Sequence, residues 1–172
     1  MRKELFRPAP AEEARLLLLI DAFSKTGGGL EGRTKLAKLD FFLRYPVYFE
    51  RALKIRDVNA SLPEEYKEDE TIESRMIRYR YGPWDPAYFA LLGSLIGRGL
   101  VEPVPVKNGI GYRTTDIGRT LAKQIANSAA WSPVAKSIVL LKRHFDMSGT
   151  FLKNFIYENF PEVTSANWGK HL

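Results

Sequence analysis

The spacing of apolar residues along the chain predicts a mainly helical protein. Over most of the sequence, apolar residues recur every three or four positions, which is the period of a helix with one buried face. Asp85-Pro86 and Ser132-Pro133 are typical helix starts, and Gly99 is a typical helix end. The predicted helices cover about residues 10–25, 34–44, 85–99, 116–126, 132–145 and 148–160, with a short helix opening at Pro46.

Alternation of apolar and polar residues predicts only a little β-structure. Residues 75–81 alternate in this way and are followed by Gly82-Pro83, which is expected to end the strand. Residues 100–106 alternate as well, and the chain then turns at Lys107-Asn108-Gly109 and returns over 111–114. Because Asn-Gly is a strong hairpin signal, the predicted fold class is mainly α with a small β-hairpin.

Charged side chains are predicted to lie in water in two places. Residues 55–74 hold two basic and seven acidic side chains, so this segment is expected to be a solvated connection of low order. A metal site made of these acids is the alternative, although nothing in the sequence fixes its geometry. On the helix over 34–44, two of the three cations Arg33, Lys35 and Lys38 are expected to point to water.

Composition restricts the classes of protein to which the chain can belong. Of its 172 residues, 45% are hydrophobic and 12% aromatic, which suffices for a packed core. The longest apolar run has five residues (16–20), and a membrane span needs about 20. Cysteine is absent, which excludes disulfides, a thiol nucleophile and cysteine-ligated zinc and leads us to expect a reducing, cytoplasmic location.

Candidate chemistry for catalysis is sparse. Ser148 lies near His144 and Asp146 in the sequence, but the three residues do not follow the order of any triad motif. The acidic residues gather in 55–74 and are not expected to line an apolar pocket. We therefore predict a protein without enzymatic activity, cofactor or metal.

The order of elements over residues 85–122 carries the most information about fold. A capped helix leads through GRGLVEP (97–103) into a hairpin and then into YRTTDIGRTLA (112–122). This order resembles the winged helix of many bacterial regulators. The resemblance implies that the helix over 85–99 is the third of a three-helix core and that the hairpin is the wing. It also implies that Gly118 closes off the start of the following helix.

Two further motifs extend the resemblance. The segments GRTKLAKLDFFL (32–43) and YRYGPWDPAYFALLGSLIGRGLV (79–101) are similar to a bacterial group with a Gly-Arg-x-Lys-Leu-x-Lys helix and a Tyr-Gly-Pro-Tyr-Ser motif. Trp84 and Asp85 stand at the last two positions of that motif. The layout looks like the middle component of three-component ABC or SMC-like ATPase defence systems, including Lamassu-type ones. On this interpretation residues 1–128 form a winged-helix domain with an insertion near 55–74, and 129–172 form a C-terminal helical extension.

Nucleic acid is a candidate partner because the net charge is +6, from 26 Lys and Arg against 20 Asp and Glu. The predicted third helix carries no amide side chain and only Asp85 and Arg98 as charged residues, so it is not expected to read bases. Contact with the DNA backbone, independent of sequence, is the prediction, with a solvated basic face as the alternative. The residues expected to make this contact are Arg75, Arg78, Arg80, Lys107, Asn108, Arg113 and Arg119.

Proteins are the other candidate partners. Aromatic residues of the third and last helices are candidate anchors, with core packing as the alternative; they are Trp84, Tyr88, Phe89, Phe151 and Phe155. The resulting hypothesis is a non-catalytic accessory subunit that binds an SMC-like or ABC ATPase, and double-stranded DNA without sequence preference, beside an effector such as a nuclease. The alternatives are a winged-helix transcriptional regulator and an antitoxin-like protein that binds a toxin.

Overall fold

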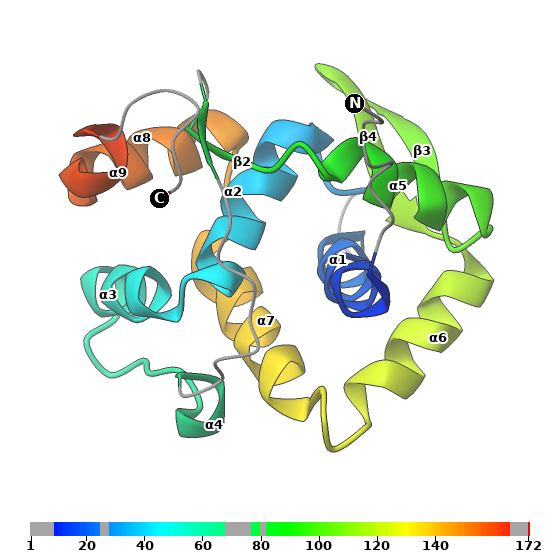
Figure 1. Cartoon of the computed structure of the whole chain (residues 1–172), viewed down its shortest axis with the longest axis horizontal. Helices are drawn as coiled ribbons and strands as arrows, with labels where there is room; N and C mark the ends of the chain where they lie inside the picture. The colour runs from blue at the N-terminus through cyan, green and yellow to red at the C-terminus, as the bar shows by residue number, and fades with distance from the viewer. Residues whose placement is uncertain (1–8, 25–27, 68–76, 80–81, 166–171) are drawn as a thin grey trace, which may run out of the picture.

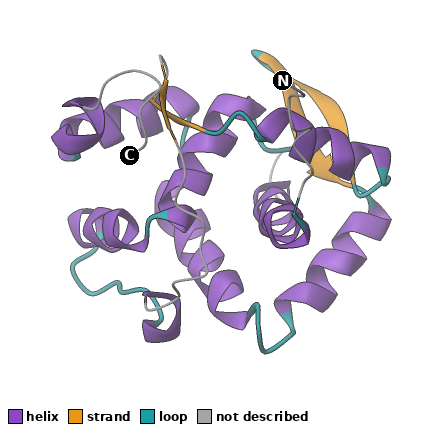
Figure 2. Ribbon diagram, viewed as in Figure 1, coloured by secondary structure: helices purple, strands orange, loops and turns teal. Residues whose placement is uncertain are grey.

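The computed structural model describes residues 9–24, 28–67, 77–79, 82–165 and 172 (Figure 1). Within these residues the chain is mainly helical with two small antiparallel sheets, which confirms the predicted fold class (Figure 2). The helices are α1 (Pro10–Ser24), α2 (Gly32–Arg44), α3 (Pro46–Arg56), α4 (Glu64–Lys67), α5 (Tyr88–Gly97), α6 (Asp116–Ala126), α7 (Ser132–Phe145), α8 (Gly149–Asn159) and α9 (Pro161–Ser165). The strands are β1 (Ile77–Tyr79), β2 (Gly82–Trp84), β3 (Val101–Val106) and β4 (Gly109–Thr114).

Helix α1 lies at the centre of one half of the molecule. Figure 1 views it nearly along its axis, and it contacts α2, α5, α6, α7 and β4. The apolar run over 16–20 is buried along its whole length, because neighbours cover α1 on most sides. The unbroken hydrophobicity of this helix thus reflects its central position.

Strands β3 and β4 form the predicted hairpin. Val106 pairs with Gly109, so Lys107 and Asn108 make a two-residue loop, and Gly109 has a φ of +139° that favours glycine. Leu30 adds a one-residue bridge to this sheet: its amide donates to the Tyr112 carbonyl at 2.8 Å, and it accepts from the Tyr112 amide at 2.9 Å. The segment between α1 and α2 is thereby tied to the hairpin.

Strands β1 and β2 form a second small sheet that differs from the prediction. Gly82 and Pro83 were expected to end a strand over 75–81, but they lie in β2 and pair with Tyr79 and Arg78 of β1. A sheet of two strands leaves one edge of each strand unpaired, and such an edge tolerates the missing N–H of Pro83. Residues 75, 76, 80 and 81 of the predicted strand lie outside the described residues.

The acidic segment is more ordered than expected. The low order predicted from residue 55 onward is wrong for 55–67, because α3 ends at Arg56, α4 follows, and Ala60, Leu62 and Tyr66 are buried. The Glu50 carboxylate accepts from the Leu62 amide at 2.8 Å, and the Tyr66 hydroxyl donates to the Leu43 carbonyl. Residues 68–74 lie outside the described residues.

Helix α2 also differs from its predicted exposure. Of its three N-terminal cations only Arg33 is exposed, while Lys35 and Lys38 are buried. The reason is that α2 contacts α1, α3, α7, α8 and β2, so little of its surface faces water. The charge pattern alone suggested a solvated face where the structure has a packed one.

The C-terminal helices share the core of the rest of the chain. Their aromatic residues pack against Phe42 of α2, with ring centroids 5.0 Å apart for Phe42 and Phe145 and 5.5 Å for Phe145 and Phe155. Phe160 joins the same cluster, and Pro161 then opens α9. Proline suits the first position of a helix. The predicted extension over 129–172 therefore packs its apolar face onto α2.

Helix α6 lies so close to the start of the hairpin that a residue larger than glycine should not fit at position 118. A Cβ added there would lie 1.8 Å from the Leu100 carbonyl oxygen, so α6 or the start of β3 must move to admit one. Gly118→Ala is expected to lower the free energy of unfolding by about 2–3 kcal/mol, the upper range for overpacking. Urea denaturation followed by circular dichroism measures this loss.

Gly93→Ala is the matched control, because a Cβ added at Gly93 meets no heavy atom within 4 Å. Its stability should stay constant or rise by up to about 1 kcal/mol, as alanine favours a helix interior. If the two variants have the same free energy of unfolding, the approach of α6 to Leu100 does not require glycine at position 118.

Candidate nucleic-acid interface

A hollow of about 780 Å³ lies between the tip of the β3–β4 hairpin, the start of α2 and the start of α8. Lys107 and Asn108 line it from the hairpin, Arg33 and Thr34 from α2, and Thr150 from α8. The N-termini of two helices thus face one space, and each carries a partial positive charge. We call this hollow the wing groove.

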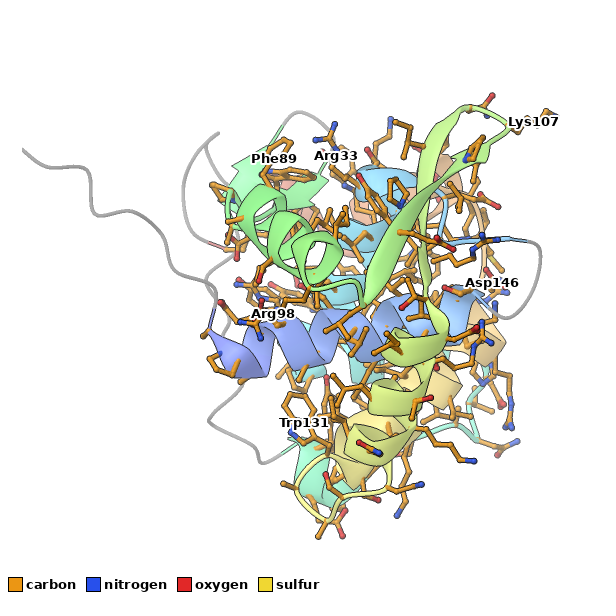
Figure 3. The ribbon with its side chains drawn as sticks, turned by 90° about the vertical axis from the view of Figure 1, so that its right-hand side faces the viewer. Arg33, Phe89, Arg98, Lys107, Trp131 and Asp146 are labelled. Carbon is orange, nitrogen blue, oxygen red and sulfur yellow. The ribbon has the colours of Figure 1, made fainter. Side chains whose placement is uncertain are left out.

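The cations of the wing groove differ in whether they are available to bind an anionic ligand. Figure 3 shows Lys107 at the hairpin tip, pointing away from the body of the protein, and Arg33 beside Phe89. Lys35, in contrast, is buried and donates to Asp146 at 3.0 Å. Burial by itself would raise the pKa of Asp146, but hydrogen bonds from Lys142 and Lys35 lower it. Asp146 therefore stays ionised and neutralises Lys35, which leaves Lys107 and Arg33 as the exposed cations of the groove, beside the exposed Glu31.

Of the predicted backbone-contact residues, the structure brings Lys107 and Asn108 together at the hairpin tip. Arg113 donates to Glu102 at 2.8 Å across the hairpin, and Arg119 lies on α6, beyond the base of the hairpin. Six residues of strand separate tip from base, a length of about 20 Å. Arg78 belongs to β1 by its backbone, and Arg75 and Arg80 lie outside the described residues. Arg33 and Thr150 were missed as groove residues, because only the packing of α2 and α8 beside the hairpin brings them there.

Two of the predicted partner-binding residues lie in the core. Tyr88 is 0% exposed and Phe155 is 7% exposed, so their assignment as surface anchors needs correction: the packing of α5 on α1 and of α8 on α2 buries them. Trp84 is half-buried, and its ring meets Tyr88 edge-on at 5.2 Å. Phe89 and Phe151 are exposed.

Helix α5 exposes no side chain suited to reading bases. Between Tyr88 and Gly97 its polar side chains are those of Tyr88, which is buried, and Ser94, whose hydroxyl donates to Glu13. Its exposed positions are Phe89, Gly93, Ile96 and Gly97. The exposed positions of α5 thus carry no polar side chain.

A buried network of charges joins α1, α2 and the start of α5. Arg15 donates twice to Asp40, at 2.7 and 3.1 Å, and the Tyr88 hydroxyl donates to the same carboxylate at 2.7 Å. Arg44 donates to Asp85 at 2.6 Å. Burial by itself would raise the pKa of Asp40, but Arg15 and Arg44 lower it, while burial and the Asp40 charge raise the pKa of Tyr88 well above 10. The carboxylate thus stays ionised and the phenol neutral, a paired arrangement that holds helices together.

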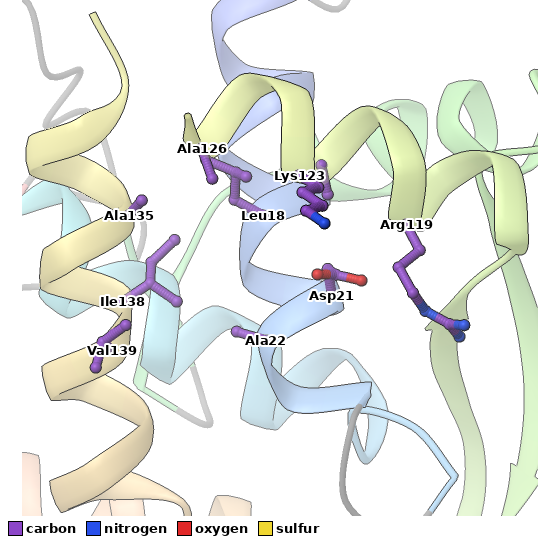
Figure 4. Close-up of a pocket in the computed structure, with 10 residues that line it drawn as sticks. Leu18, Asp21, Ala22, Arg119, Lys123, Ala126, Ala135, Ile138 and Val139 are labelled. Atoms are coloured by element: carbon purple, nitrogen blue, oxygen red, sulfur yellow. The ribbon is translucent and has the colours of Figure 1, made fainter. Parts of the chain in front are cut away.

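A second hollow of about 430 Å³ lies between α1, α6 and α7 (Figure 4). Leucine, isoleucine, valine and alanine make most of its wall, and Asp21, Arg119 and Lys123 are its polar residues. Asp21 accepts from the Thr114 hydroxyl at 2.9 Å, which ties this wall to β4. Arg119 faces this hollow and not the wing groove.

The described residues contain neither a cluster of metal ligands nor a helix that could cross a membrane. Within them, no three His, Asp or Glu side chains converge in a way that would hold a metal ion. No helix in the described part of the chain has both the length and the apolar character needed to cross a bilayer. No family model, curated protein or solved structure matches this chain.

Proposed function

We propose that this protein is a non-catalytic winged-helix subunit that holds the nucleic-acid backbone in its wing groove while it is bound to larger proteins. One observation carries the proposal: α1, the Leu30 bridge, α2, α5 and the β3–β4 hairpin occur along the chain in the order helix, β-bridge, helix, helix and hairpin. This is the order of a winged helix. The elements α3, α4, β1 and β2 are then an insertion between its second and third helices.

The wing groove is suited to phosphate groups. Lys107 and Arg33 offer positive charge, Thr34 and Thr150 offer hydroxyls, and the N-terminus of α2 offers amide groups that do not donate to the side chain of its N-cap residue, Glu31. Phosphates occur at every step of a nucleic acid, so such contacts position the protein without reading sequence. The exposed face of α5 also supports binding that is independent of sequence, because it lacks the donors that a base-reading helix needs.

The proposed setting is a bacterial defence complex with an SMC-like or ABC ATPase and an effector. It rests on the motifs of residues 32–43 and 79–101, which include most of α2 and all of β2 and α5. In this setting the protein works in the cytoplasm. A transcriptional regulator is the less favoured alternative, since it requires base recognition that α5 does not offer.

Lys107→Glu is expected to weaken binding to a duplex of random sequence about tenfold at low salt, because it places a carboxylate where a phosphate would lie. The slope of log affinity against log salt concentration should fall by about 1. Fluorescence anisotropy with a labelled 20-base-pair duplex measures both quantities. An unlabelled duplex of another sequence should compete equally well.

Lys136→Glu is the matched control, because Lys136 is an exposed lysine on α7 outside the wing groove. This variant changes the net charge by the same amount and should bind the duplex nearly as well as the wild type. Two results would overturn the proposal: equal weakening by both variants, or competition by one sequence far better than by others.

A further inference from the structure

The outer face of α5 exposes an apolar surface on a helix that is otherwise well buried. Phe89 is 58% exposed and Ile96 is 37% exposed, and helical geometry places these residues, seven positions apart, on one side. The opposite side of the helix, which includes Leu91, Leu92 and Leu95, is buried in the core. We call the exposed side, with Phe89, Gly93, Ile96 and Gly97, the α5 face.

Phe89 is held in place although it is exposed. The Arg33 guanidinium lies 4.5 Å from the centre of its ring, and the Trp84 ring meets it at 5.9 Å. These contacts come from α2 and β2, so three elements fix the orientation of one exposed aromatic ring. A large apolar side chain that is already ordered loses little conformational entropy when a partner covers it.

The shape of the α5 face admits a closely packed helix. A Cβ added at Gly93 or at Gly97 meets no heavy atom within 4 Å, so the surface beside Phe89 and Ile96 is open. Side chains of a second helix can enter this space, and such pairs pack with axes about 8–10 Å apart. The ten residues of α5 span about 15 Å, which matches two to three turns of a partner.

The exposed charges beside this face are cationic. Arg33 lies next to Phe89 at the N-terminal end of α5 (Figure 3). Arg98 follows the C-terminal end, and its side chain is 65% exposed although it lies 3.7 Å from the buried carboxylate of Glu13. Facing a second copy, this surface would bring like charges together, which disfavours a homodimer. Acidic side chains on a partner would meet both cations.

From these observations we propose that the α5 face docks an amphipathic helix of another protein, with Phe89 and Ile96 against its apolar stripe and Arg33 and Arg98 against flanking Asp or Glu. This partner surface is distinct from the phosphate-binding wing groove, although Arg33 borders both. The inference stands if duplex binding fails, because it depends on the exposed apolar side chains of α5.

The test uses selection from a phage-displayed library of helical peptides with random surface positions, carried out on the full-length protein. Selection should enrich peptides that carry an apolar stripe and a net negative charge. Gly93→Leu fills the open surface and should weaken the selected peptides at least tenfold in anisotropy measurements. Arg33→Glu combined with Arg98→Glu should weaken them at least as much and shift selection toward cationic peptides.

Gln124→Leu is the matched control, since it adds the same side chain at an exposed position of α6, away from the α5 face. It should bind the selected peptides like the wild type, and thermal melts should show that Gly93→Leu is folded. The proposal is overturned if enriched peptides lack negative charge or bind Gly93→Leu equally well. It is also overturned if Gly93→Leu abolishes a wild-type homodimer in sedimentation or weakens duplex binding as much as Lys107→Glu does.

Discussion

Replacing Asp40 by alanine is expected to lower the free energy of unfolding by about 3–5 kcal/mol, because removing one partner of a buried ion pair leaves the other charge unpaired. Asp40 is 0% exposed and accepts both hydrogen bonds of Arg15, as well as that of the Tyr88 hydroxyl. Arg44 lies 3.8 Å from the same carboxylate. The substitution thus removes the group that α1, α2 and α5 share, and it leaves the Arg15 guanidinium in a core without its counter-ion.

Urea denaturation at pH 7 measures this loss, with Glu102→Ala as its control. Glu102 pairs with Arg113 at 2.8 Å, but both side chains are 45% exposed. Such surface pairs contribute about 0–1 kcal/mol. A loss for Asp40→Ala no greater than the loss for Glu102→Ala would mean that the buried network does not hold the helices together.

Features that depend on neighbours in sequence were predictable. Gly99 ends α5 with a φ of +70°, as its position after the apolar stripe suggested. Thr115 caps α6 by accepting from the Gly118 amide at 3.0 Å, and Ser148 caps α8 by accepting from the Phe151 amide at 3.1 Å. Each of these interactions closes within three or four residues, so the sequence pattern contains both partners.

Features that depend on distant partners were not predictable. Arg15 and Asp40 are 25 positions apart, and Lys35 and Asp146 are 111 apart. In the sequence, such charges look like those of a solvated helix face, because burial with a partner leaves no local periodic signal. The same reason explains α4: its acidic residues suggested a solvated segment, although Tyr66 among them anchors it in the core.

The residues of the candidate site also differ in whether a local sequence signal predicted their positions. The Asn-Gly turn signal placed Lys107 and Asn108 at an exposed tip, and the structure has them there. The aromatic residues near the start of α5 offered no such signal, since helical spacing cannot say which side packs on α1. Only the packed structure separates the buried Tyr88 from its exposed neighbour Phe89.

The buried amine of Lys38 is expected to make the protein more stable as the pH rises from 7 to 9. Burial, with a smaller effect of the Lys153 charge, lowers the pKa of Lys38 from 10.5 to about 7. Between these two values the unfolded chain binds a proton that the folded chain does not, so the free energy of unfolding increases with pH. The increase between pH 7 and pH 9 should be about 2 kcal/mol.

Lys38→Met should remove this rise and increase stability at pH 7, because the variant buries no amine in a site that is 1% exposed. Lys136→Met, at an exposed position on α7, should keep the rise of the wild type. Urea denaturation from pH 7 to 9.5 tests both, a range that stays below the pH at which Tyr88 would ionise in the unfolded chain. If the stability of the wild type and of Lys38→Met depends on pH in the same way, then Lys38 remains protonated in the folded protein. In that case other interactions offset the cost of burying its charge.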